Sequence, residues 1–402
     1  MFNFLNFFIF FSFLFDLFAW ETKEIKKSVT MYGFILPSIV SSSKGVQSFS
    51  QSNLSAYTSA ANPMLDSVQD KSRYSFQVAQ SRFGIRAKYE SLIQGDLEFD
   101  IIDFTKSSPT TQANPRVRRA VITLNIDENN KLLLGQDWDL FSPLAPHTYN
   151  LIGHYFESGD LGFMRHQLTF LHQCANSGPS KHQLGIALGL PTSNATSSDS
   201  TIELTGIPTL SLRYTVNKDA KNSYGISLIG TKIQESKTST RKIKNYGLNA
   251  FNETTLFNDS LNLRSEIYWG RNLYNLGTLS LSYGSATSDA YEIGGWITGS
   301  HKIGENKSIF AGFGLAKITN EEKMLPAYTT SNGVSSLSNT GPGIKNNSTI
   351  RVGMDYTPLD QFKVFMELAV LETTHKLTTN DLKLHNPKTN AFIVNTGFKL
   401  DF

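Results

Sequence analysis

Charged side chains recur at every second position in two neighbouring segments of this chain. One ladder is basic and the next is acidic. The basic ladder is Arg82, Arg86 and Lys88, and the acidic ladder is Asp96, Glu98 and Asp100. The eight histidines are scattered and have no spacing that suggests a Ser/His/acid set. Fixed charges without a nucleophile attract or repel ions, so this pattern predicts electrostatic filtering and not catalysis.

Two further arginines extend the basic set. Arg119 lies in the polar phase of segment 117–125, and Arg165 opens segment 165–173 in phase with Gln167. One interpretation is a basic wall that attracts anionic solutes and narrows at Arg82, Arg86, Arg119 and Arg165. The other interpretation is that arginines and acids pair across neighbouring strands and only stiffen the wall. The sequence alone leaves both open.

Several classes of site are not supported by the sequence. Cys174 is the single cysteine, so no internal disulfide forms, and we interpret it as an inert thiol near a turn. No D-x-D-x-D-G pattern indicates a calcium loop. The 37 Lys and Arg against 34 Asp and Glu are dispersed along the chain. We therefore expect no metal, no cofactor, no enzyme activity and no nucleic-acid partner.

The elements that must position these charges are β-strands, because apolar residues alternate with polar ones at period 2. The last segment is the clearest case, with Phe392, Val394, Thr396, Phe398, Leu400 and Phe402 on one face. About sixteen such segments follow one another, each with a weak signal of its own. They lie near 30–40, 81–89, 95–104, 117–125, 131–137, 165–173, 183–190, 209–216, 223–233, 243–252, 261–270, 289–302, 308–318, 349–357, 361–373 and 391–402.

The connections between these segments alternate between short and long. Residues 90–94 and 126–130 are short links, whereas 105–116 and 138–164 are long ones. Tight turns at one end and long loops at the other are typical of a transmembrane, antiparallel, up-and-down β-barrel. A large soluble antiparallel protein is the alternative, but its outward face would be of the Lys/Glu/Thr kind. The mean hydropathy of −0.22 then reflects a lipid-facing half and a polar half.

The chain divides into three parts on this interpretation. Residues 1–19 are almost entirely apolar and are expected to be a secretory signal peptide, with an N-terminal anchor as the alternative. Residues 20–28 form a short periplasmic segment. Residues 29–402 form one transmembrane barrel with about sixteen strands, short periplasmic turns and long extracellular loops.

The chain resembles Gram-negative outer-membrane porins, and within them the DcaP-like family. The resemblance is carried by VTMYGFILPSIV (29–40), SRFGIRAKYE (81–90), LLLGQDWDLFSP (132–143) and GFMRHQLTF (162–170), and by the terminal Phe402. It implies a homotrimeric sixteen-stranded diffusion channel for small hydrophilic solutes, with a preference for anions such as dicarboxylates. The N-terminal extension of that family is reduced here to residues 20–28.

The same resemblance implies a location and partners. The protein is expected in the bacterial outer membrane, among its lipids and lipopolysaccharide, after export through the periplasm. The barrel assembly machinery would read the strand that ends in Phe402. The third long loop, 138–164, would fold inward and constrict the pore, with Asp137 and Asp139 at its start; a surface loop is the alternative. A barrel enzyme of the lipase or protease type, a gated substrate-specific transporter and an adhesin stay open as alternative functions.

Overall fold

The computed structural model describes residues 27–44, 72–101, 115–150, 155, 158–162, 164–174, 180–190, 207–234, 242–273, 289–321, 328–331, 334–337, 344–376 and 388–402. The predicted signal peptide (1–19) and residues 20–26 lie outside this part of the chain. Within the described ranges, no helix has the length and apolar character that would let it cross a membrane.

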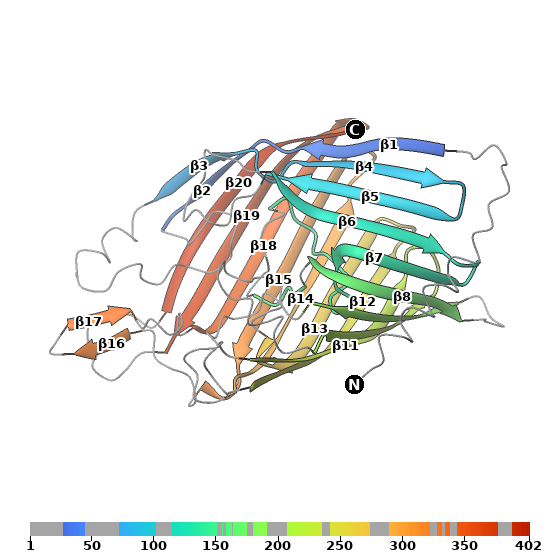
Figure 1. Ribbon diagram of the computed structural model, residues 1–402. Coiled ribbons are helices and arrows are strands. Elements are labelled where there is room, and N and C mark those ends of the chain that lie inside the picture. The colour runs from blue at the N-terminus through green and yellow to red at the C-terminus, as the bar shows by residue number, and fades with distance from the viewer. Residues whose placement is uncertain are drawn as a thin grey trace.

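The described residues form a closed antiparallel β-barrel with sixteen strands around its wall (Figure 1). Two of these strands are interrupted. The first consists of β1 (Lys27–Ile35) and β2 (Ser38–Ser42), and the second of β3 (Arg73–Gln77) and β4 (Arg82–Tyr89). The barrel closes where β1 pairs with both β4 and β20, with Phe34 opposite Asp401. The predicted fold is thereby confirmed.

The other fourteen wall strands are continuous and pair in chain order. They are β5 (Ile93–Asp100), β6 (Arg116–Asn125), β7 (Asn130–Trp138), β8 (Met164–Cys174), β9 (Lys181–Gly189), β10 (Thr209–Asn217), β11 (Ser223–Gln234), β12 (Lys242–Leu256), β13 (Leu261–Arg271), β14 (Tyr291–Lys302), β15 (Lys307–Ile318), β18 (Ile344–Leu359), β19 (Phe362–His375) and β20 (Lys388–Asp401). The pair β16 (Tyr328–Ser331) and β17 (Val334–Leu337) is a separate hairpin in the seventh long loop, which the sequence did not predict.

The break in the first strand has a local cause. Pro37 has no N–H to donate to a ladder, so a strand cannot run through it undisturbed. The backbone N–H of Leu36 turns away from the sheet and donates to Ser81 Oγ over 3.0 Å. Ser81 lies in the corresponding break of the second strand, so the two interruptions support each other.

The two faces of the wall differ as the period-2 pattern predicts. On β19 the side chains of Met366 and Val370 are 43% and 47% exposed, whereas the intervening Glu367 and Ala369 are buried. Large apolar side chains are exposed in the same way along the other strands, and buried polar side chains alternate with them. This is the arrangement of a barrel with an apolar exterior and a polar interior.

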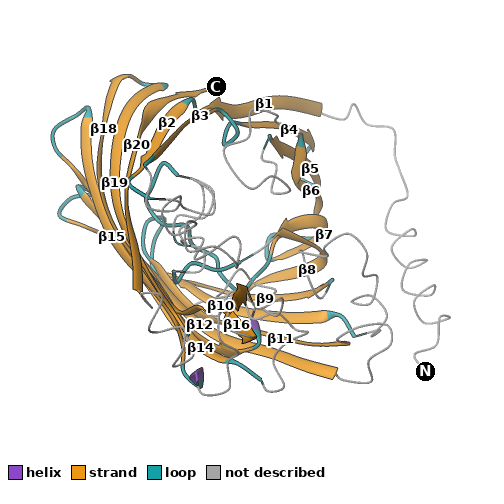
Figure 2. Cartoon of the chain, turned by 90° about the vertical axis from the view of Figure 1, so that its left-hand side faces the viewer, coloured by secondary structure: helices purple, strands orange, loops and turns teal. Residues whose placement is uncertain are grey.

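The third long loop, 139–163, lies inside the barrel, as Figure 2 shows for its described residues. We call this segment the inner loop. Its residues contact the inner faces of β11–β15, β18 and β19, on the side of the barrel opposite β6 and β7. A surface loop would not reach those strands, and the expected role of residues 138–164 in constricting the pore stays a prediction.

Candidate functional site

The inner loop is held first by the wall strand β13. Glu266, fully inside the barrel, accepts a hydrogen bond from Ser142 Oγ (2.5 Å) and another from the backbone N–H of Leu144 (2.9 Å). Just before them, the carbonyl of Phe141 accepts from Ser227 Oγ and from Asn249 Nδ2. Phe141 itself is completely buried. Residues 141–144 of the loop are therefore bound to the barrel wall through both a backbone carbonyl and a backbone N–H group.

A second carboxylate holds the middle of the loop. Glu367 on β19 accepts from Thr148 Oγ1 (2.7 Å) and from the backbone N–H of Tyr149 (2.9 Å). Its other oxygen lies 2.5 Å from Arg351 Nη1, and both side chains are 1% exposed. Glu266 and Glu367 thus act in the same way, each binding one hydroxyl and one N–H of the inner loop. We call the two residues the carboxylate clamps.

Aromatic packing fixes the loop between these polar contacts. The ring of Tyr149 stacks on Phe365 with centroids 4.1 Å apart and planes inclined by 5°. Tyr155 is fully buried and lies against Gly312 and Gly314 of β15, with the Arg351 guanidinium 5.5 Å from its ring. The inner loop is consequently a packed element of the lumen.

Gly314 provides a test of this packing. A Cβ at position 314 would lie 2.3 Å from the carbonyl oxygen of Ser158 and 2.5 Å from Tyr155 Cδ1. We expect Gly314→Val to displace the loop and to lower the free energy of unfolding by about 1–3 kcal/mol, as overpacking does. Thermal unfolding in detergent measures this. The matched control is Gly95→Val, because a Cβ there meets no atom within 4 Å. Equal losses in both variants would contradict the packing.

Asp160 in the inner loop predicts a pH dependence. Burial raises the pKa of Asp160 to about 8 from an ordinary value of 3.8, and among the described residues only the N–H of Leu161 donates to its carboxyl. Between about pH 4 and pH 8 the folded protein therefore keeps a proton that the unfolded chain has released. The free energy of unfolding should fall as the pH rises through this window, by at most about 1.4 kcal/mol per unit, and should then level off.

Thermal unfolding midpoints of the wild type and of Asp160→Asn at pH 5, 7 and 9 check this expectation. The asparagine cannot ionise, so the variant should lose less stability than the wild type between pH 5 and pH 9. Parallel curves for the two proteins would show that the Asp160 carboxyl does not titrate in this window.

Most of the charged residues expected at the constriction are paired in the structure. Arg86 lies 2.6 Å from Asp96, Arg119 lies 2.7 Å from Asp137, and Arg165 lies 3.2 Å from Asp139. The remaining acids of the ladder are also paired: Glu98 with Arg118 (2.8 Å), and Asp100 with Arg116 (2.6 Å) and Arg118 (3.0 Å). Lys88 is exposed near the turn end of β4. The cross-strand pairing that the sequence left open is thus observed.

Arg118 joins these ion pairs because of an irregularity in the pairing of β5 with β6. The period-2 alternation of apolar and polar residues does not predict this irregularity. The pairing of β5 with β6 shifts by one residue, so that Glu98 is opposite Arg119 but Phe99 is opposite Val117. A bulge of this kind places two consecutive side chains on one face. Arg118 and Arg119 therefore both bind inward-facing carboxylates, although strict period 2 separates them.

Three cations that line the two cavities beside the inner loop have no carboxylate partner in the described part of the chain. Arg82, Arg213 and Lys363 form no ion pair with a described residue. Lys363 is directly opposite Lys399 across β19 and β20, on the inner face, and Lys399 contacts Asp401 at 2.5 Å. Two like charges at opposed positions destabilise a sheet. Both lysines were visible in the polar phase of their segments, but only the register brings them together.

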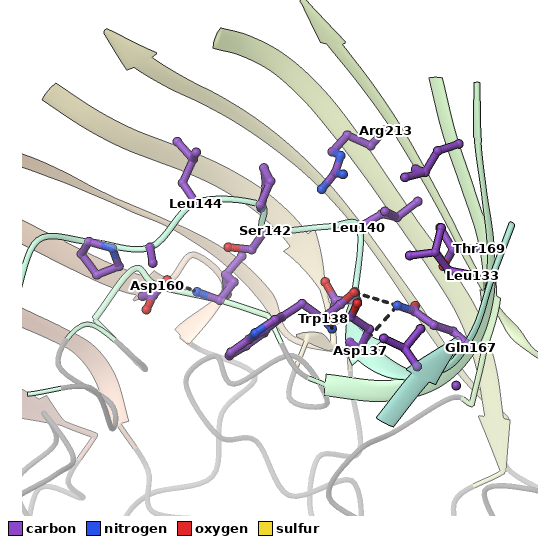
Figure 3. Close-up of a pocket in the computed structure, with 18 of the residues that line it drawn as sticks. Leu133, Asp137, Trp138, Leu140, Ser142, Leu144, Asp160, Gln167, Thr169 and Arg213 are labelled. Atoms are coloured by element: carbon purple, nitrogen blue, oxygen red, sulfur yellow. Dashed lines mark hydrogen bonds between the residues drawn. The ribbon is translucent and has the colours of Figure 1, made fainter. Parts of the chain in front are cut away.

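Two cavities flank the inner loop and share Arg82 and Pro146. The turn-side cavity, about 370 Å³, is lined by Arg82, Arg264, Lys363 and Lys399 and by the loop residues 146–149. The lateral cavity, about 380 Å³, lies between the loop and strands β6–β8 and β10 (Figure 3). Among the described residues, no cluster of His, Cys, Asp and Glu has the geometry of a metal site. At the turn-side cavity, Arg82 and Lys363 form no ion pair with a described residue, whereas Arg264 binds Glu253 and Lys399 binds Asp401. The carboxyl of Asp355 lines the same cavity.

Comparisons with known proteins agree with this architecture. No family model matches the sequence, and no curated protein sequence matches it either. Solved structures do: the outer-membrane channel DcaP of Acinetobacter baumannii superposes with a TM-score of 0.65 at 15% identity, over 95% of this chain and 99% of that one. An anion-selective porin from Comamonas acidovorans gives 0.56 at 12% identity, over 94% and 100%. OprB of Pseudomonas putida gives 0.52 at 9% identity, over 92% and 94%. The chain therefore has the fold of outer-membrane porins, as its resemblance implied.

Proposed function

We propose that this protein is a diffusion channel of the bacterial outer membrane that admits small hydrophilic solutes and prefers anions. The observation that carries the proposal is the set of cations beside the inner loop. Lys363 and Lys399 face each other on the inner wall, and Arg82 borders both cavities. Their arrangement costs stability, which a requirement for positive potential in the lumen would explain.

The ion-paired arginines also bear on the proposed preference for anions. Because Arg86, Arg119 and Arg165 are neutralised by neighbouring aspartates, they contribute little net potential to the lumen. We expect the cations that form no ion pair with a described residue, Arg82, Arg213 and Lys363, to set the sign of the potential, although the carboxyl of Asp355 lines the same cavity as Arg82 and Lys363. The wall with its apolar exterior provides the passage, and the inner loop narrows it. Dicarboxylates and other small organic anions are the solutes that we expect to pass.

The assembly and export that the sequence suggested also remain part of this proposal. A homotrimer is supported by the likeness to OmpT of Vibrio cholerae in its trimer form, with a TM-score of 0.51 at 13% identity. The backbone of Phe402 exchanges two hydrogen bonds of 3.1 Å with Gly33, and its ring is exposed on the outer face. The exposure of this ring supports the proposal that assembly machinery and lipid contact Phe402. Export through the periplasm would use residues 1–19.

Solute uptake into liposomes tests the proposal. Purified protein is reconstituted, and swelling rates are compared for anionic, neutral and cationic solutes of matched size. We expect all small solutes to enter faster than into protein-free liposomes, with succinate ahead of a neutral diol and a diamine. Absence of protein-dependent swelling would refute the channel, and faster entry of the diamine would refute the anion preference.

A further inference from the structure

The lateral cavity has an unusually apolar wall for the inside of a barrel with a polar interior. The inward-facing residues Val121, Leu133 and Leu171 of β6–β8 line it, and Leu140 and Leu161 of the inner loop line its other side. Val121, Leu140 and Leu161 are at most 5% exposed. Lumen positions of a water-filled channel are ordinarily polar. Apolar side chains from both the wall and the loop therefore converge on this one space.

Cations border the same space. Arg213 extends from β10 toward the inner loop (Figure 3). Arg82 lines both this cavity and the turn-side cavity. Neither forms an ion pair with a described residue. Two of the three acidic lining residues are already engaged, because Asp137 binds Arg119 and Asp139 binds Arg165. The third, Asp160, is buried, and burial raises its pKa to about 8, so that its carboxyl is largely protonated at neutral pH. The uncompensated charge at the cavity is thus positive.

We propose that the lateral cavity is a binding subsite for anions that carry an apolar body, such as aromatic or branched-chain monocarboxylates. The carboxylate binds the Arg213 guanidinium, whose planar donors match its two oxygens. The apolar body lies against Leu133, Leu140 and Leu171. A volume of about 380 Å³ is within the range of small-molecule sites, and about 150 Å³ is enough for a benzene ring. This inference rests on the proposed channel function and specifies a class of solute for it.

Block of the potassium chloride current in planar bilayers tests the subsite, with phenylacetate and acetate as probes. We expect phenylacetate to reduce the conductance at concentrations where acetate has no effect. Arg213→Gln should raise the half-blocking concentration of phenylacetate at least about tenfold, because a charge-assisted hydrogen bond is lost. Leu133→Asn should raise it as well, through loss of the apolar wall.

Lys363→Gln is the matched control, since it removes one unpaired cation from the other cavity. It should leave the ratio of the half-blocking concentrations of phenylacetate and acetate unchanged. Equal block by the two probes, or loss of phenylacetate block in Lys363→Gln but not in Arg213→Gln, would overturn the subsite. These outcomes differ from a failure of the channel itself, in which the wild type would carry no chloride-selective current at all.

Discussion

Release of the inner loop should give the largest change in channel behaviour. In the double variant Glu266→Gln, Glu367→Gln, we expect a higher single-channel conductance and noisier open-channel current than in the wild type. Each clamp binds a hydroxyl and an N–H of the loop through one carboxylate. A typical hydrogen bond contributes about 0.5–1.5 kcal/mol, and one to a charged group such as Glu367, which is paired with Arg351, contributes about 1.5–3 kcal/mol. An amide replaces these bonds only in part. Single-channel recording in planar bilayers measures the effect.

Glu98→Gln is the control for this variant. Glu98 is also an inward-facing carboxylate, but its partner is Arg118 of the wall and not the inner loop. The substitution therefore removes one inward-facing carboxylate without releasing the loop, and the conductance should stay near the wild-type value. If the clamp variant and Glu98→Gln had equal conductance, the loop would not be held by the clamps in the way that the hydrogen bonds indicate.

Removal of the opposed lysines should give the largest change in selectivity. In Lys363→Gln, Lys399→Gln we expect the permeability ratio of chloride to potassium to fall about five- to tenfold. A unit charge about 4 Å from a permeating ion contributes about 1 kcal/mol even at the dielectric constant of water, which is about a fivefold effect for one charge. The reversal potential in a potassium chloride gradient measures the ratio.

A control at an ion pair tests whether ion selectivity depends on the net charge of the lumen or on the presence of any arginine. Arg119→Gln, Asp137→Asn removes one charge of each sign from a pair held at 2.7 Å. The reversal potential of this variant should stay close to that of the wild type. A shift as large as that of the lysine variant would mean that the paired arginines also set the selectivity.

The wall of the barrel could be predicted from the sequence because apolar and polar residues alternate within each strand segment. The segment ending in Phe402 shows its lipid face and its inner face without any knowledge of its neighbours. The alternation of short and long connections then orders the strands. The break at Pro37 and the hairpin β16–β17 were missed, because neither interrupts the alternation of apolar residues in a recognisable way.

The site could be predicted only in part, because its chemistry depends on contacts between distant residues. Arg82 and the loop 138–164 could be named as candidates from the sequence, but the pairing of Arg118 required the bulge opposite Glu98. The opposition of Lys363 and Lys399 depends on the register of β19 with β20. A shift of two residues would keep both lysines on the inner face but no longer opposite each other, and the period-2 pattern does not distinguish these two registers.

The reversal potential of the wild-type protein in a planar bilayer, under a tenfold gradient of potassium chloride, tests the central claim most directly. That claim is that unpaired cations beside the inner loop give the lumen a positive potential. The account predicts a reversal potential with the sign of a chloride-selective channel, which moves toward zero in Lys363→Gln, Lys399→Gln. A potassium-selective reversal potential in the wild type, unchanged by these substitutions, would contradict it.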